Sequence, residues 1–223
     1  MVVFWDEARQ RSIEVPSWVN DLESFRRWSD DKSFPEEGRI YYLDGKVWVD
    51  MSKEEIFAHV GVKTAIALVL AALVRGERMG QFYTDGVYVS NVSADISNKP
   101  DGLFISRATI RSKRVRFTEG VRGGYIELEG SPDMVLEIVS DSSVKKDKIR
   151  LREKYWKARV KEYWLVDARG ENLQFEVYRR TPRGYRPQRH RDGWVESKVY
   201  GKSFRLVRAL DEDGHPEFTL EMK

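Results

Sequence analysis

The sequence predicts an α/β fold, in which helices flank a mixed β-sheet. Short buried strand-like runs alternate with longer helical segments, and turn-forming residues separate them. With 223 residues, 41% of them hydrophobic and 34% charged, the chain can form one full core with an ionic surface. We expect a single domain overall, with an N-terminal lead-in over 1–38, a core over 39–181 and a C-terminal β-rich extension over 182–223 packed on the core.

The core begins with the strongest local signal in the chain, a β-hairpin. Asp44-Gly45 separates two β-type runs at 39–43 and 46–50, and Asp-Gly is a favoured turn for two-residue hairpins. Ser52 and Glu55 then predict a capping box that opens a long helix over about 53–75.

The other expected elements follow from the same patterns of apolar runs and turn residues. In order, they are a loosely organised start over 1–36 with a short helix at 21–28, strands at 81–84 and 87–90, a polar loop at 91–98, a strand at 101–106, a basic, glycine-rich excursion at 107–130, a strand at 134–140, a helix at 144–158, strands at 163–167 and 173–178, and short strand-like pieces in the tail.

Composition bears on the compartment more than on the activity. Cysteine is absent, which fits a reducing compartment. The N-terminus has no signal-peptide pattern, and the most apolar stretch, 64–74, is too short to span a bilayer. We therefore expect a cytoplasmic protein without a membrane segment. The net charge of +3 permits nucleic-acid binding but does not argue for it.

Glu137 is the most informative residue, because it interrupts the apolar run 134–139. A run of this kind is typical of a strand that is buried on both faces. Carboxylates are rarely buried unless a cation accompanies them. Glu137 therefore predicts either a metal ion or a neighbouring Lys or Arg.

Asp101 offers a second carboxylate, at the start of another strand directly after Pro100. If the two strands are neighbours, Asp101 and Glu137 can converge near the strand ends. Two carboxylates suit Mg²⁺, which prefers oxygen ligands. Such an ion stabilises charge on a phosphoryl oxygen and lowers the pKa of bound water, as phosphodiester hydrolysis requires.

A lysine would complete such a site by neutralising developing charge, and the helix at 144–158 offers three. Lys148 lies near the centre of the apolar stripe on an ideal helix. Lys146 points the other way on that helix, but it lies where the chain need not yet be helical. Lys154 lies at the flank of the stripe. Each can also be interpreted as a surface lysine with a buried stem.

Several motifs together resemble the Uma-two family, which belongs to the PD-(D/E)XK nuclease superfamily. The motifs are Lys-Pro-Asp (99–101), Pro-Asp-Met-Val-Leu-Glu-Ile-Val-Ser (132–140), Lys-Lys-Asp (145–147) and Val-Lys-Glu-Tyr-Trp-Leu-Val-Asp (160–167). The resemblance covers about 39–205. It implies a restriction-endonuclease-like core, and it makes Asp101 and Glu137 ligands of Mg²⁺ or Mn²⁺ in an enzyme that cleaves DNA.

The sequence departs from this pattern at the lysine. The superfamily carries it two residues after the glutamate, where this chain has Val139, and many members of the family carry one where this chain has Leu151. The role then falls to Lys146, Lys148 or Lys154. Lys146 is favoured, because the Lys-Asp step there matches the family.

Other residues are accessory candidates. Glu55 and His59 are one helical turn apart and share a face, so they could reach the site. Three histidines and no cysteine argue against zinc. Two basic stretches with interleaved aromatic residues are typical of a nucleic-acid surface, although such runs are often only solvated loops. The candidates for nucleic-acid binding are Arg111, Lys113, Arg114 and Arg116, and the second stretch runs from 179 to 191.

Two hypotheses of function follow. The first is a Mg²⁺-dependent endonuclease, a hydrolase of phosphodiester bonds in DNA, for which cutting both strands would favour a homodimer. The second is a catalytically inactive module that keeps the nuclease fold and binds DNA or another partner. A lysine ammonium close to both carboxylates would distinguish the first from the second.

Overall fold

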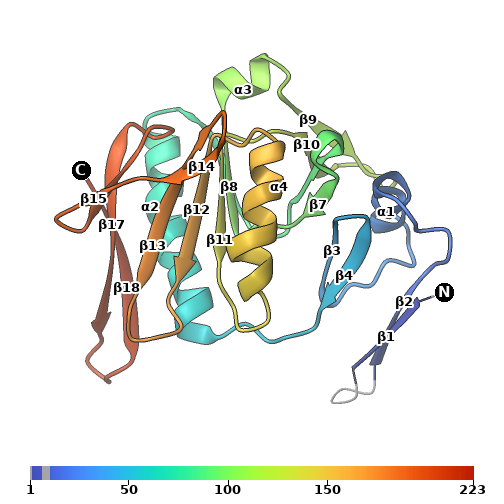
Figure 1. Ribbon diagram of the computed structural model, residues 1–223, viewed down its shortest axis with the longest axis horizontal. Helices are drawn as coiled ribbons and strands as arrows, with labels where there is room; N and C mark the ends of the chain where they lie inside the picture. Colours follow the sequence, from blue (N-terminus) through green and yellow to red (C-terminus); the bar gives the residue numbers. More distant parts are fainter. Residues whose placement is uncertain (1, 7–10) are drawn as a thin grey trace.

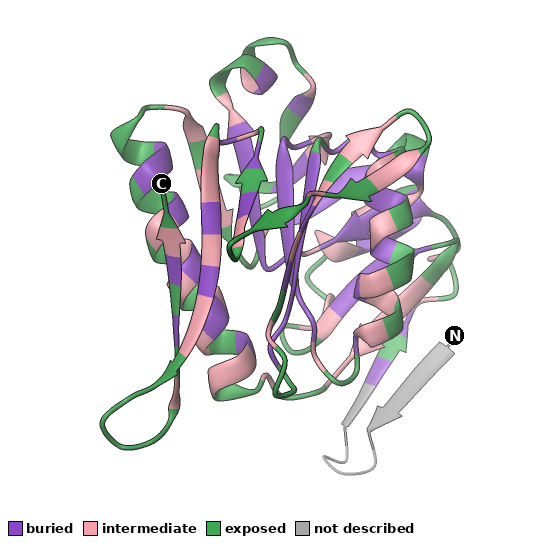
Figure 2. Cartoon of the chain, turned by 60° about the vertical axis from the view of Figure 1, so that its left-hand side comes forward, coloured by how far each residue is buried: buried purple, intermediate pink, exposed green. Residues whose placement is uncertain are grey.

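The computed structural model describes residues 2–6 and 11–223, and it confirms an α/β fold with mixed sheets (Figure 1). The central sheet has six strands, and only β11 and β12 are parallel to each other. The strand order is β14 (Gly184–Pro187), β13 (Gln174–Thr181), β12 (Glu162–Asp167), β11 (Met134–Ile138), β8 (Gly102–Ser106) and β5 (Gly80–Thr84). Figure 2 shows that the middle strands of this sheet are largely buried.

The predicted neighbours β8 and β11 lie side by side in this sheet, with Phe104 opposite Met134 and Gly102 opposite Leu136. Met134 and Leu136 belong to one apolar cluster, whereas Val135 belongs to another on the opposite face. Side chains alternate along a strand, so Glu137 shares the face of Val135.

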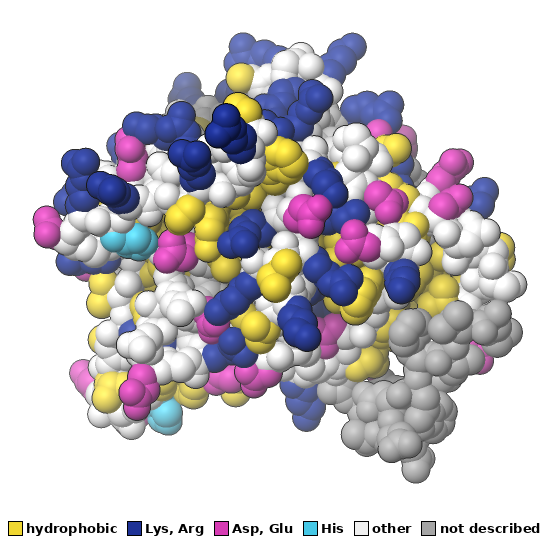
Figure 3. Space-filling model, viewed as in Figure 1, with side chains coloured by type: hydrophobic (Ala, Val, Ile, Leu, Met, Phe, Trp, Pro, Cys, Tyr) yellow, Lys and Arg dark blue, Asp and Glu magenta, His cyan; other side chains and the backbone are white. Residues whose placement is uncertain are grey.

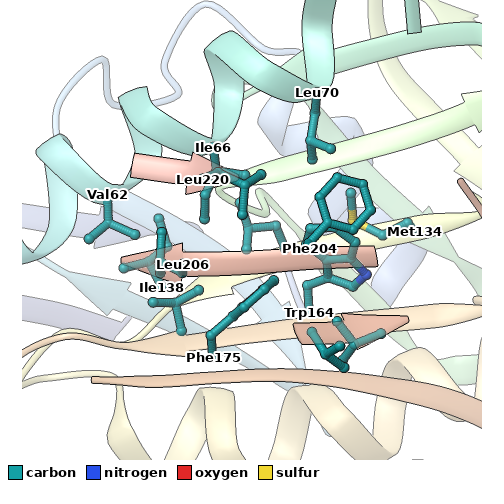
Figure 4. Close-up of a cluster of buried hydrophobic side chains, with 14 of the residues drawn as sticks. Val62, Ile66, Leu70, Met134, Ile138, Trp164, Phe175, Phe204, Leu206 and Leu220 are labelled. Carbon is teal, nitrogen blue, oxygen red and sulfur yellow. The ribbon is translucent and has the colours of Figure 1, made fainter. Parts of the chain in front are cut away.

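One face of the central sheet is covered by a long helix and the C-terminal sheet. The helical segment comprises a π-helical turn, η1 (Ile56–Gly61), and α2 (Val62–Gly76). The strands of the C-terminal sheet are β15 (His190–Arg191), β16 (Trp194–Ser197), β17 (Lys202–Leu210) and β18 (Pro216–Met222). Figure 4 shows Ile66 and Leu70 of α2 facing Phe204 and Trp164 within this apolar cluster.

The helical segment Ile56–Gly76 is long and apolar enough to cross a membrane by length and composition. It is therefore longer than the apolar run at 64–74. Val62, Ile66 and Leu70 are nevertheless fully buried against the sheets, so this segment is a core helix here, as predicted.

The other face of the central sheet packs against helices and a second six-stranded sheet. The helices are η3 (Lys146–Leu151), which is π-helical, and α4 (Arg152–Lys157). The second sheet has the order β4 (Lys46–Asp50), β3 (Arg39–Leu43), β7 (Ile96–Asn98), β6 (Tyr88–Asn91), β10 (Tyr125–Gly130) and β9 (Val115–Glu119). Strands β3 and β4 form the predicted hairpin, with Leu43 paired to Lys46. Three elements precede β3 along the chain: β1 (Val2–Asp6), β2 (Arg11–Val15) and α1 (Leu22–Ser29).

Three expectations about local structure were wrong. The first long helix begins after Glu55, whose own side chain caps it at Ala58 N–H, and Ser52 instead bonds Asp50. The expected loop at 91–98 contains a short helix, η2 (Val92–Ala94), and strand β7, because buried Ile96 pairs with two strands. The expected excursion at 107–130 forms α3 (Arg107–Arg111) and the β9–β10 hairpin of the second sheet.

Glu162 joins the central sheet to the C-terminal sheet. Its side chain is 1% exposed. Oε1 accepts hydrogen bonds from the N–H groups of Lys198 (2.6 Å) and Val199 (3.2 Å), and Oε2 accepts from Ser197 Oγ (2.6 Å) and Trp164 Nε1 (3.1 Å). Four donors converge on one carboxylate, so this glutamate is structural.

We predict that Glu162→Ala lowers the free energy of unfolding by about 3 kcal/mol, because it leaves buried donors without an acceptor. Urea unfolding followed by circular dichroism measures this change. Glu153→Ala is the control, since Glu153 is exposed in an i,i+4 pair with Lys157, and it should cost less than about 0.5 kcal/mol. Equal midpoints for the two variants would contradict the structural role of Glu162.

Candidate metal and catalytic site

Asp101 lies where β8 and β11 separate. Pairing between the two strands ends at Gly102 and Leu136. Beyond that point, the Oδ2 atom of Asp101 accepts a hydrogen bond from the N–H of Ile138 at 2.8 Å. The carboxylate of Asp101 thus takes the place of a strand partner for the N–H of Ile138, the residue after Glu137. The two predicted acidic residues therefore lie at the same end of the sheet.

Glu137 is buried, with 2% exposure. Asn98 Nδ2 and the Tyr155 hydroxyl each donate to its Oε1 atom at 2.9 Å. Burial, and then the charge of Asp147, raises the pKa of Glu137 well above its usual value. Both donors bind Oε1. The other oxygen, Oε2, accepts no hydrogen bond from the described residues and can bind a further ligand.

His59 lies between two carboxylates. Its Nδ1 atom is 3.3 Å from Glu54 Oε2, and its Nε2 atom is 3.5 Å from Asp101 Oδ2. Both ring nitrogens are buried without a hydrogen-bond partner in the described part of the chain. Ligand atoms of Glu54, His59 and Asp101 all lie within 4.8 Å of one another. This combination of oxygen and nitrogen donors can hold a divalent cation.

Two cations face the same carboxylates. Lys63 Nζ is 3.1 Å from Asp101 Oδ1 and 2.9 Å from Asp85 Oδ2. Arg39 contacts Glu54 and lies 3.3 Å from Asp101 Oδ1. Burial opposes ionisation of Asp101, but His59, Lys63 and Arg39 outweigh it and hold the pKa of Asp101 well below its usual range.

Lys146 faces the site from the Glu137 side. Its ammonium lies 3.4 Å from Asp147 Oδ1 and 4.8 Å from the centre of the Tyr41 ring. Burial opposes its charge, but Asp147 and Glu137 outweigh burial and raise the pKa of Lys146. Asp147 is itself buried and bonded to Ser143. A charged ammonium therefore lies beside Asp147, and it interacts electrostatically with Glu137.

The other two candidate lysines bind elsewhere. Lys148 Nζ lies 2.7 Å from Asp167 Oδ2, and Lys154 Nζ lies 2.9 Å from Asp44 Oδ1. An ideal α-helix directs Lys148 inward, but residues 146–151 form a π-helix. Spacings of 100° per residue therefore misplace these side chains.

Sequence reasoning missed Glu54, Lys63 and Asp147. Glu55 and His59 do not share a helical face as predicted, because the helix begins only after Glu55. Glu54, in the preceding loop, approaches His59 instead. Asp147 carried a usable signal, the Lys-Lys-Asp motif at 145–147. Lys63 carried none, because its contacts are made to residues distant in sequence.

The predicted nucleic-acid-binding residues do not join this site. Strand β8 starts directly after Asp101 and ends at Ser106, where α3 begins. Its length separates Asp101 from the basic stretch. That stretch comprises Arg111, Lys113, Arg114 and Arg116. Arg116 pairs with Glu129 at 2.6 Å.

A cavity of about 540 Å³ opens beside His59. Phe57 and Phe218 contribute apolar walls, and Ser140 and Arg169 contribute polar groups. Of the candidate metal ligands, His59 lines this cavity, so a substrate group in the cavity would approach the site from the His59 side.

The comparisons agree with this fold. The family model of Uma2, described as "Putative restriction endonuclease", matches residues 22–205. A crystal structure described as "a putative nuclease belonging to DUF820" from Anabaena variabilis has a TM-score of 0.59 at 17% sequence identity, and the match covers 81% of this chain and 90% of that chain. A search of the curated proteins gives no match.

The fold and the site thus define a chain of the restriction-endonuclease-like class. The chain belongs to the Uma2 family, and the match begins at α1, earlier than the predicted start at residue 39. The resemblance and the predicted fold are confirmed.

We predict that, without metal, the Glu137→Gln variant becomes more stable relative to the wild type as pH rises. A carboxyl group whose pKa is raised on folding stabilises the protein below its unfolded pKa of 4.5, and this contribution is lost at higher pH. Glutamine stays neutral throughout. In EDTA, the melting temperature of the variant minus that of the wild type should increase between about pH 5 and pH 8.

The matched control is Glu153→Gln at an exposed position, for which the two melting curves should stay parallel. Parallel curves for Glu137→Gln as well would show that Glu137 is not held at a raised pKa.

Proposed function

We propose that this protein is a metal-dependent endonuclease that hydrolyses phosphodiester bonds in DNA. The main support is that Asp101 accepts the N–H next to Glu137 while its carboxylate also faces His59. This arrangement gathers groups that could bind a metal at one end of the sheet, and one of them, His59, lines an open cavity. Membership of a family described as restriction endonucleases supports the same reaction.

Asp101 and Glu137 would hold Mg²⁺ or Mn²⁺, with Glu54 and His59 as further ligands. Within the described ranges, the ring nitrogens of His59 have no hydrogen-bond partner, which fits a metal ligand, and a nitrogen donor suits Mn²⁺ better than Mg²⁺. When bound, the metal polarises the scissile phosphate and lowers the pKa of its water. Asn98 and Tyr155 orient Glu137 through Oε1.

Lys146 is the proposed catalytic lysine. Its pKa is raised, because Asp147 and Glu137 outweigh burial. It therefore stays protonated and stabilises negative charge that develops on the phosphate, rather than acting as a base. Lys63 contacts Asp101 directly, and we assign it to positioning that carboxylate in its ionised form.

The substrate and setting follow from the same proposal. DNA is the substrate that the family description favours. Cleavage of both strands would be served by a homodimer with one site for each strand. The absence of cysteine fits a cytoplasmic enzyme.

We predict that the wild type nicks or linearises supercoiled plasmid with Mg²⁺ or Mn²⁺ and that EDTA abolishes this activity. Glu137→Gln should be inactive, because it removes the charge of a ligand and little volume. Lys146→Met should lower the cleavage rate about 10²-fold or more. Gel electrophoresis of the plasmid over time measures both effects.

Lys148→Met and Lys154→Met are the matched controls, since each lysine pairs with an aspartate away from Glu137. Normal cleavage by all three lysine variants would reject the assignment of a catalytic lysine to this segment. A folded wild type that cleaves nothing with either ion would favour the inactive, DNA-binding alternative.

A further inference from the structure

The two basic stretches of the sequence meet at a second cavity, about 590 Å³ in volume. It lies near the start of β11 and β12, whereas Glu137 lies toward the end of β11. The cavity is therefore at the opposite end of the central sheet from the metal site. Its basic lining residues are Arg114, Arg159, Lys161, Arg179, Arg180 and Lys198.

The two acidic residues of this cavity do not neutralise the arginines. Asp133 accepts from Ser106 N–H (2.6 Å) and Thr109 Oγ1 (2.8 Å) and pairs with Lys161 (2.5 Å). Glu162 is occupied by the four donors described above. Both carboxylates serve the fold.

Four guanidinium groups therefore remain without a carboxylate partner among the described residues. Arg114 donates to the Arg159 carbonyl oxygen at 3.1 Å, and Arg180 donates to that of Trp156 at 3.0 Å. In the described chain, the side chains of Arg159 and Arg179 have no hydrogen bond or ion pair. Guanidinium groups match phosphate oxygens in geometry and charge.

Arg159 also has a strained backbone. It follows α4 with a φ of 60°, a left-handed conformation that glycine usually supplies at helix ends. This conformation disfavours any residue with a side chain, so replacing Arg159 by glycine removes the cation without a cost in stability.

We propose that this cavity and the basic surface around it bind the phosphate backbone of a nucleic acid, separately from the metal site. Further cations extend beyond the cavity, on α3 (Arg111), in the turn after it (Lys113) and on β14 (Arg186). Figure 3 shows Lys and Arg side chains gathered at this end of the molecule, around α3. An extended polyanion fits this spread better than a single small phosphate does. The inference extends the proposed nuclease function but does not require cleavage.

Binding of fluorescein-labelled duplex DNA to the full-length protein in EDTA tests this proposal by anisotropy. Arg159→Gly and Arg179→Gln remove one cation each, and glycine also relieves the strained φ. We expect the double variant to bind about tenfold more weakly or worse, with unchanged or higher thermal stability. The slope of log K against log salt should shrink by about 0.9 for each phosphate that the variant no longer neutralises.

Arg122→Gln is the matched control. Arg122 is an exposed arginine in the β9–β10 turn, away from the cavity. The Arg122→Gln variant should therefore bind duplex DNA with the affinity and salt slope of the wild type. Wild-type affinity and slope in the double variant would overturn the inference. Binding of inorganic phosphate in calorimetry without any binding of duplex would also overturn it, in favour of a small-anion site. Because no metal is present, a failure of the proposed cleavage would leave this result unaffected.

Discussion

The hydrogen bond from Ile138 N–H to Asp101 is the interaction on which the candidate site depends. It satisfies a backbone donor that β8 no longer pairs, and it holds the Asp101 carboxylate at the residue that follows Glu137. The pKa values of the two groups shift in opposite directions. Cations and His59 hold the pKa of Asp101 low despite burial, whereas burial and Asp147 raise that of Glu137. A divalent cation would relieve this imbalance, since it favours ionisation of both.

The parts that could be predicted from the sequence are those that local patterns encode. The β3–β4 hairpin follows from Asp44-Gly45, and the place of Glu137 in a buried strand follows from its apolar neighbours. The sequence also predicts that Asp101 lies at the start of a strand, and β8 begins directly after it. Its role as a metal ligand stays a prediction.

The rest depends on features without a local signal. Glu54 approaches His59 because the chain before the helix is not helical, and the π-helix at 146–151 directs Lys148 to Asp167 rather than inward. Strand β7 was missed because a three-residue strand leaves almost no periodicity. Lys63 could not be found, since its partners come from other elements.

The arrangement of charge explains why two anion-binding regions would be useful in one chain. The candidate metal site is rich in carboxylates, which repel a phosphate backbone, and Arg39 and Lys63 are already paired there. These two cations therefore offset the acidic groups but leave little net attraction for a phosphate backbone. At the other end of the sheet, the arginines that lack a carboxylate partner in the described chain can supply long-range attraction, because exposed charge raises association rates over about a Debye length. A separate basic surface would attract the nucleic acid and would let the proposed metal ligands stay acidic.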